Sequence, residues 1–245
     1  METLGGLLLV LVILMAFLAP AVLIVLLFIF ILKRNRKTTD EMLIAASQLK
    51  AVYTTSPQQS LLDPLRQFRF TKHDGRGGRI NQLFDLKRNN VPWKVFDYSY
   101  ETSGAGVGND SDFTHTFLVA QSQPSFNLLP AFVLVKDQPN FLEKLLGNEG
   151  GIVVDDPEFE KTYTLDGPDQ KRVHDLFSSP EIIAFFDAPS MVNEMKNLMV
   201  ECDTRNFVLF RTGGWMKPLE RIRFLNQAET ILSLLVKQAQ KQKGS

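Results

Sequence analysis

The sequence predicts an α+β fold in which one transmembrane helix precedes a mainly antiparallel β-sheet domain that ends in a long helix. Three observations support this prediction. The chain of 245 residues opens with an uninterrupted apolar run. Segments with alternating apolar residues then occur in groups, rather than in strict alternation with helical segments, which is typical of antiparallel sheets. Residues 218–242 repeat apolar side chains every three or four positions, as an amphipathic helix does.

The apolar run extends from Leu7 to Leu32 and contains one poor helix former, Pro20. As a helix it would be about 39 Å long, enough for one tilted or kinked span of a hydrocarbon core about 30 Å thick. A cleaved signal peptide would have a basic start and a shorter apolar stretch, whereas Glu2 and the α-amine are the charges before this run. The run therefore predicts a retained membrane anchor.

Basic residues predict the orientation of this anchor. No Lys or Arg precedes the run, and four follow it: Lys33, Arg34, Arg36 and Lys37. Because basic flanks stay on the cytoplasmic side, we expect a single-pass protein of the inner (plasma) membrane, with the N-terminus outside and the C-terminal domain in the cytoplasm. The single cysteine, Cys202, allows no intramolecular disulfide, which agrees with a reducing compartment.

The sequence divides into a membrane anchor with its basic flank (1–37), a juxtamembrane helix and linker (38–60) and a cytoplasmic α+β domain (61–245). Residues 38–53 predict the helix, because they open with two threonines and carry apolar residues at mixed three- and four-residue spacing. Residues 61–92 show no clear period, and HDGRGGR at 73–79 predicts a glycine-rich turn or a mobile loop.

Strands are predicted from residue 93 onwards. WKVFDYSYET and FTHTFLVAQS alternate and flank a Gly- and Asp-rich linker, which predicts a hairpin with a long tip. Further strands are expected at 131–137, 150–156 and 158–165. Two more, at 197–203 and 206–212, are expected to be joined by a tight turn at Thr204 and Arg205.

Three helices complete the predicted domain. Asp166-Gly167 ends a strand and Pro168 suits the first position of a helix that places Val173, Leu176 and Phe177 on one face. A second short helix begins at Pro180. The apolar stripe of the last helix comprises Leu219, Ile222, Leu225, Ala228, Ile231, Leu232, Leu235 and Ala239. A pleckstrin-homology-like roll closed by this helix is an alternative architecture.

Residue patterns for catalysis, metals and cofactors are missing from the sequence. His73, His115, His174 and Cys202 lack metal-ligand spacing, and no Gly-x-Ser-x-Gly motif occurs. The glycines of residues 103–110 lie between two strands, whereas a phosphate loop leads into a helix. The acids of residues 155–160 are interpreted as a turn and the polar face of a strand. We expect no cofactor and no metal, and the catalytic residues of any enzyme stay unknown.

A basic segment, 63–88, is a candidate membrane surface. Its basic residues exceed its acids by four, and together with the flank of the anchor it could face the anionic cytoplasmic leaflet. The candidate surface comprises Lys33, Arg34, Arg36, Lys37, Arg66, Arg69, Arg76 and Arg79. A solvated basic face is the alternative. The whole chain carries 27 basic and 27 acidic residues, so it lacks the charge of a nucleic-acid-binding protein.

Three stretches resemble a group of bacterial proteins with one N-terminal transmembrane helix and a cytoplasmic domain. They are VFDYSYET (95–102), LPAFVLVKD (129–137) and DPEFEKTYTLDGPDQKRVHDLFSSPEIIAFF (156–186). The resemblance implies a bacterial inner-membrane protein. It implies no catalytic residues, because that group has no established activity.

Two functions follow as hypotheses. The first is a membrane-tethered binding or scaffolding module without catalytic activity, whose partners are the lipid bilayer and a membrane protein. The second is a membrane-anchored hydrolase with a site assembled around His115, His174 and the acids of residues 155–160. It predicts a concave pocket that brings a histidine within hydrogen-bond reach of a carboxylate or hydroxyl. The sequence leaves the oligomeric state open.

Overall fold

The computed structural model describes residues 18, 22–30, 33, 38–66, 68, 76–103, 110–120, 124–136, 151–189, 191, 198–211 and 216–244. The chain divides into two compact units, Met1–Ala45 and Ala46–Ser245, each described by itself. Residues 22–30 are helical, and so are residues 38–49, where a helix was predicted as far as residue 53. Most of the predicted anchor lies outside the described residues, and no helix within them is long and apolar enough to cross a membrane.

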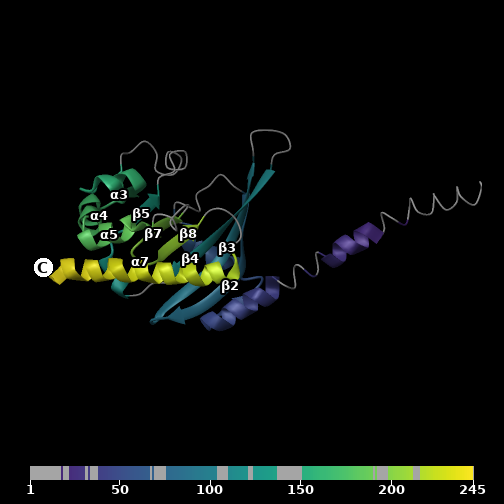
Figure 1. The fold of residues 1–245 in the computed structure, drawn as a ribbon. Coiled ribbons are helices and arrows are strands. Elements are labelled where there is room, and N and C mark those ends of the chain that lie inside the picture. The colour runs from purple at the N-terminus through teal and green to yellow at the C-terminus, as the bar shows by residue number, and fades with distance from the viewer. Residues whose placement is uncertain are drawn as a thin grey trace, which may run out of the picture. The chain divides into compact units, whose positions relative to one another are not determined.

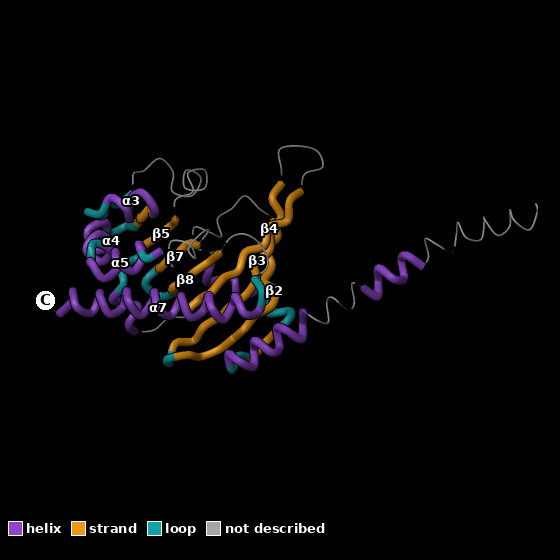
Figure 2. The backbone as a smooth tube through the Cα atoms, viewed as in Figure 1, coloured by secondary structure: helices purple, strands orange, loops and turns teal. Residues whose placement is uncertain are grey.

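The second unit contains one sheet of eight strands in the order β1-β2-β3-β4-β8-β7-β5-β6 (Figures 1 and 2). The strands are β1 (Val52–Thr54), β2 (Arg76–Arg88), β3 (Val91–Ser103), β4 (Asp110–Ala120), β5 (Phe132–Lys136), β6 (Tyr163–Asp166), β7 (Leu198–Cys202) and β8 (Phe207–Arg211). All seven pairings are antiparallel. The predicted α+β class with a mainly antiparallel sheet is therefore confirmed.

The strand register places buried apolar residues in rows that cross the sheet. Because directly paired residues of antiparallel strands point to the same face, each row belongs to one face. One row is Phe84, Val95, Leu118, Leu209, Val200, Leu134 and Leu165. The next row on that face is Leu86, Trp93, Ala120, Phe207, Cys202 and Phe132. Every one of these residues is buried, so this face forms a continuous apolar floor.

Helices cover this floor. The longest, α7 (Pro218–Gly244), runs along the sheet in Figure 1 and buries Phe224, Leu225, Ala228, Ile231, Leu232, Leu235 and Ala239. Near β6 lie α3 (Pro157–Thr162), α4 (Gln170–Phe177) and α5 (Pro180–Asp187). Their rings form one aromatic cluster: Phe159 lies 5.0 Å from Tyr163 and 6.1 Å from Phe186 between ring centroids, and Phe177 lies 5.0 Å from Phe132.

A second buried cluster lies on the opposite face of the sheet. Its members from the strands are Ile80, Leu83, Phe96, Tyr98, Val119, Val133, Val135, Met199, Val208 and Phe210. The short helix η1 (Gln59–Leu65) adds Leu65, and Phe68 follows it. The sheet therefore has apolar side chains buried on both faces. This explains why β5, β7 and β8 are apolar on both phases of their alternation.

Several predicted elements are confirmed. β3 and β4 pair from Trp93 with Ala120 to Ser103 with Asp110, so the predicted hairpin exists, and its tip at 104–109 lies outside the described residues. β7 and β8 pair around a turn in which Thr204 has a φ of 73°. The helices α4 and α5 are found where they were expected, although Asp169 is the N-cap of α4 and Pro168 precedes it.

The predicted strands at 150–156 and 158–165 are largely wrong. Residues 151–156 form no strand, and residues 157–162 form α3. The reason is local: the Asp156 carboxylate accepts hydrogen bonds from the backbone amides of Glu158 (3.1 Å) and Phe159 (2.9 Å), and Pro157 occupies the first turn. This is a helix N-cap followed by a proline that tolerates the first helical position. Only residues 163–166 enter the sheet, as β6.

The region that lacked a clear period also contains regular structure. Residues 76–79, predicted as turn or loop, are the first residues of β2, and the whole strand is 13 residues long. A Cβ built on Gly78 would lie 2.0 Å from the Tyr98 hydroxyl oxygen, so a larger residue at this position would have to displace the Tyr98 side chain. In α7, Leu219 is 72% exposed although the stripe predicted it to be buried, and Arg221 is buried instead.

Candidate functional site

A fully buried ion pair joins β3 to α7. The Asp97 carboxylate accepts a hydrogen bond of 2.5 Å from Nη2 of Arg221, and both side chains are 0% exposed. The hydroxyl of Thr116 donates to the other carboxylate oxygen at 2.9 Å. Arg221 also donates from Nε to the Met216 carbonyl (3.2 Å) and from Nη2 to the side-chain oxygen of Gln82 (3.3 Å).

Local structure explains how these groups meet. Asp97 and Thr116 are direct partners in the β3–β4 ladder, so their side chains share a face. The register of β2 shifts between Asn81 and Phe84, and Gln82 has a φ of 52°, as at a β-bulge that turns a side chain aside. The Arg221 guanidinium carbon lies 5.5 Å from the centre of the Phe84 ring, which is within cation–π range.

The electrostatics of this ion pair indicate a structural role rather than a catalytic one. Burial raises the pKa of Asp97 above its ordinary value, while the charge of Arg221 and hydrogen bonds from Arg221 and Thr116 act to lower it. Nη1 of Arg221 and Nε1 of Trp93 have no hydrogen-bond partner among the described residues. Because neither member of the pair reaches solvent, we assign it to holding α7 on the sheet.

His174 of α4 lies near a hydroxyl and two carboxylates. Its Nε2 is 3.2 Å from the Ser178 hydroxyl oxygen and 3.9 Å from an oxygen of Asp155, and its Nδ1 is 3.5 Å from an oxygen of Asp175. The contact that a hydrolase site would need is therefore present for one histidine. The acids at 158 and 160 lie in the first turn of α3.

Of the other parts of the predicted hydrolase site, Asp155 lies near His174, whereas His115 belongs to a distant strand. His115 lies in β4, which is four strand spacings from β6, about 19 Å. The backbone amide of Ser178 donates to the His174 carbonyl at 2.8 Å, so it is not available to an oxyanion. Asp155 is 89% exposed at its side chain, and Asp175 is 50% exposed.

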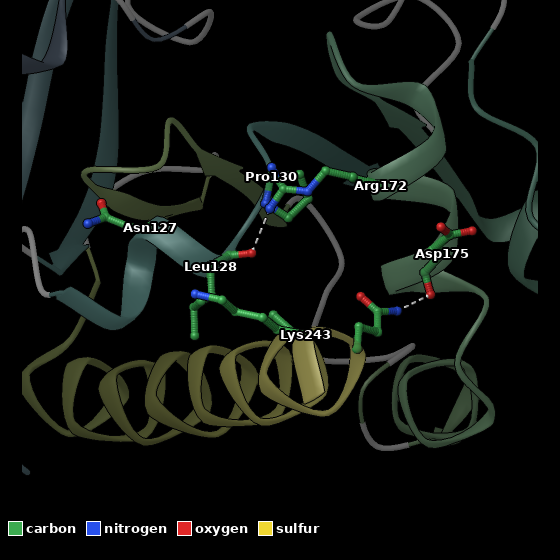
Figure 3. A pocket seen from close by; sticks show the side chains of 8 residues that line it. Asn127, Leu128, Pro130, Arg172, Asp175 and Lys243 are labelled. Carbon is green, nitrogen blue, oxygen red and sulfur yellow. Dashed lines mark hydrogen bonds between the residues drawn. The ribbon is translucent and has the colours of Figure 1, made fainter. Parts of the chain in front are cut away.

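A pocket of about 670 Å³ lies between η3 (Pro124–Leu128), α4 and the last turns of α7 (Figure 3). Its lining comprises Asn127, Leu128, Pro130, Arg172, Asp175, Ala239, Gln242 and Lys243. Two hydrogen bonds fix its walls. Nη2 of Arg172 donates to the Leu128 carbonyl (2.9 Å), and the side-chain amide of Gln242 donates to the Asp175 carbonyl (2.6 Å). His174 lies about 160° around α4 from Arg172, so it faces away from this pocket.

The pocket residues were missed by sequence reasoning. They come from η3, the segment after it, α4 and α7, which are spread over more than a hundred positions, and no local spacing marks them. A signal did exist for the buried ion pair, because Asp97 occupies the apolar phase of β3 with Trp93 and Val95. A carboxylate at such a position requires a buried partner.

The predicted membrane-surface residues are only partly described. Lys33 and Arg79 are exposed, Arg76 is the first residue of β2, and Arg34, Arg36, Lys37 and Arg69 lie outside the described residues. Nε of Arg66 is 3.2 Å from an oxygen of Asp63. Arg88, from the same basic segment, pairs with Glu229 at 3.0 Å. Some of the predicted positive charge is therefore balanced within the chain.

The described part of the chain shows neither a metal-binding cluster nor a reactive cysteine thiol. No group of three or more His, Cys, Asp or Glu side chains is arranged to hold a metal among the residues that the structure describes. Cys202 is a buried free cysteine, and burial raises the pKa of its thiol to about 12. A thiol with such a pKa is a packing residue rather than a nucleophile.

Comparisons with family models, with curated proteins and with solved structures find no match to this chain. The function of this chain is therefore inferred from its own residues. The candidates among the described residues are a buried ion pair without solvent access, a partly exposed Ser–His–Asp group and a pocket with fixed polar walls.

Proposed function

We propose that this protein is a single-pass membrane protein whose cytoplasmic domain binds a partner or ligand without catalysing a reaction. The observation that supports the tether is the helix at residues 22–30. All nine side chains are apolar, and each is between 45% and 69% exposed. A helix that is apolar on every side is stable in a protein core or in a membrane.

The energetics favour lipid for this segment. Nine Val, Leu, Ile and Phe residues contribute about 3–5 kcal/mol in favour of membrane insertion. They belong to a longer apolar run, Leu7–Leu32, that ends at a basic cluster beginning with Lys33. The pocket supports the binding half of the proposal, since a volume of about 670 Å³ is within the range of small-molecule sites.

The tether is tested by fractionating a bacterial host that expresses the full chain. We expect the chain to stay with the membranes after an alkaline wash. Replacing Leu23, Leu26 and Phe30 together with lysine adds at most about 8–12 kcal/mol against insertion, the sum that holds at the centre of a membrane helix, and should remove the chain from the membrane fraction. The matched control replaces the same three residues with isoleucine and should behave as the wild type. Equal fractionation of the two triple variants would contradict the tether.

Orientation needs a separate measurement. A green fluorescent protein fused after Ser245 should fluoresce, and an alkaline phosphatase fused there should be inactive, because the fusion site is proposed to be cytoplasmic. Replacing Lys33, Arg34, Arg36 and Lys37 with glutamine should weaken or invert this preference, since these cations set the orientation. The opposite pattern of reporters in the wild type would overturn the proposed topology.

A membrane-anchored hydrolase is the second candidate, and the contact of 3.2 Å between Ser178 and His174 favours it. A Ser nucleophile requires a base in this position. The test is hydrolysis of a p-nitrophenyl ester by the purified full chain. A hydrolase would lose most of its activity with Ser178→Ala and keep it with Ser179→Ala, which removes the neighbouring hydroxyl. We expect no turnover above background in any of the three proteins.

A further inference from the structure

We propose that the pocket between η3, α4 and the end of α7 binds a small molecule that carries a phosphate or carboxylate next to an apolar group. This inference rests on the proposed binding function and names its ligand class. It does not depend on the membrane tether. The pocket is built within the second compact unit, from residues of η3, the segment after it, α4 and α7.

Arg172 is the proposed anchor for the anion. One of its nitrogens, Nη2, is held by the Leu128 carbonyl at 2.9 Å, which fixes the plane of the guanidinium at the pocket wall (Figure 3). No ion pair to Arg172 is found within the described part of the chain. Its remaining N–H groups can therefore donate to a ligand, and a guanidinium presents them in a fork that matches phosphate and carboxylate oxygens.

Lys243 provides a second cation, which makes the pocket positive. In the described residues Lys243 has no ion-pair partner, although Asp175 lines the same pocket. The Asp175 carboxylate contacts His174 at 3.5 Å instead. Two unpaired cations and one carboxylate leave a net charge of about +1 in the pocket, and this favours a singly or doubly charged anion.

The rest of the lining indicates what accompanies the anion. Leu128, Pro130 and Ala239 supply an apolar floor, while Asn127 and Gln242 supply amides at the rim. Sites of this composition combine apolar contact area with a few polar groups that orient the ligand. An inorganic ion alone would leave this floor uncovered, so an aromatic or aliphatic group attached to the anion fits better.

The test measures binding of phenyl phosphate to the purified full chain in a neutral detergent by isothermal titration calorimetry. Inorganic phosphate is the probe without the apolar part, and 2-phenylethylammonium is the probe with reversed charge. We expect saturable binding of phenyl phosphate at one site, weaker binding of inorganic phosphate and none of the ammonium. The anion could belong to a lipid headgroup or to a free small molecule. Binding of phenyl phosphate to the chain in phosphatidylcholine nanodiscs, with and without phosphatidylglycerol, separates these two sources. If the site holds an anionic headgroup, phosphatidylglycerol should compete with phenyl phosphate.

Variants connect this binding to the pocket. Lys243→Gln should weaken phenyl phosphate binding about fivefold and Arg172→Gln about tenfold or more, since one is a charge contact and the other a charge-assisted fork. Asp175→Asn should strengthen binding about twofold by removing a repulsive charge. The matched control is Lys237→Gln, which removes the same charge from α7 outside the pocket and should leave binding unchanged.

The outcomes separate this inference from the tether. Absence of saturable phenyl phosphate binding would overturn the ligand class even if the chain fractionates with membranes. Equal weakening by Lys237→Gln and Lys243→Gln would also overturn it, because a general charge effect would then explain the binding. A thermal melt of Arg172→Gln shows whether this variant loses binding because it unfolds. If it unfolds, Lys243→Gln gives the decisive result, because Lys243 is exposed near the end of α7.

Discussion

Replacing Arg221 with methionine should destabilise the domain severely. The substitution leaves Asp97 buried with Thr116 as its remaining hydrogen-bond donor, and removes the donors to the Met216 carbonyl and the Gln82 side chain. Breaking a buried ion pair by removing one partner costs about 3–5 kcal/mol. The free energy of unfolding is measured by urea denaturation of the full chain in neutral detergent, followed by circular dichroism. The matched control is Arg223→Met, which removes an exposed arginine from the same helix.

The cost of Arg221→Met should also depend on pH. Burial already raises the pKa of Asp97, and the attraction of Arg221 opposes that rise. Without Arg221 the pKa of Asp97 in the folded state rises further. The folded state then binds more protons than the unfolded state over a wider pH interval. Stability then falls as pH rises through that interval, and the deficit of Arg221→Met should be larger at about pH 8 than at about pH 5.

A double-mutant cycle isolates the ion pair. Asp97→Asn removes the charge while keeping a group that Thr116 can contact, and the double variant Asp97→Asn with Arg221→Met should be more stable than the two separate losses predict. We expect a coupling of about 2–3 kcal/mol. Additive losses, or a cost of Arg221→Met no greater than that of Arg223→Met, would refute the assignment of this pair to holding α7 on the sheet.

Three further predictions concern stability and reactivity. Gly167→Ala should destabilise the domain by about 1–3 kcal/mol because a Cβ there would lie 2.5 Å from a backbone carbonyl oxygen, whereas Gly244→Ala, which meets nothing within 4 Å, should be neutral in the same urea assay. Asp156→Ala should cost about 0.5–2 kcal/mol by removing the N-cap of α3, and the same change at exposed Asp155 should cost less. Cys202 should react with a thiol reagent near neutral pH only when the domain unfolds, because the residue is 2% exposed and burial raises the pKa of its thiol to about 12. Rapid labelling without urea would contradict this last expectation.

The local part of the fold could be predicted from the sequence, and the non-local part could not. The β3–β4 hairpin and α4 follow from short-range alternation, turn residues and helical spacing. α3 was missed although its signal was present. Asp156 followed by Pro157 marks a helix start, but Glu158 and Glu160 two positions apart also fit the polar face of a strand. The contacts of Phe159 distinguish the helix from the strand. Phe159 packs against Phe177 and Phe186, which lie elsewhere in the sequence, so local spacing does not reveal these contacts.

The candidate site was beyond sequence reasoning for a related reason. Arg172 and Lys243 are ordinary solvated cations by their local sequence, and only the packing of α4 beside α7 brings them to one pocket. The alternation of β3 did indicate that Asp97 is buried, but its partner lies 124 positions later. The anchor and its orientation stay predictions, since most of that run lies outside the described residues.

The strand order has a consequence for how the chain is made. Among the described strands, β7 and β8 are the last to leave the ribosome, yet they fill the place between β4 and β5. Thr116 pairs with Arg211, 95 positions later. At a translation rate of roughly 5–20 residues per second, the edge of β4 therefore stays unpaired for about 5–20 s before β8 is synthesised. During synthesis the nascent domain exposes an open, apolar strand edge of the kind that recruits other chains. Chaperone capture of nascent chains should therefore peak before residue 198 is translated and fall once residue 211 has emerged.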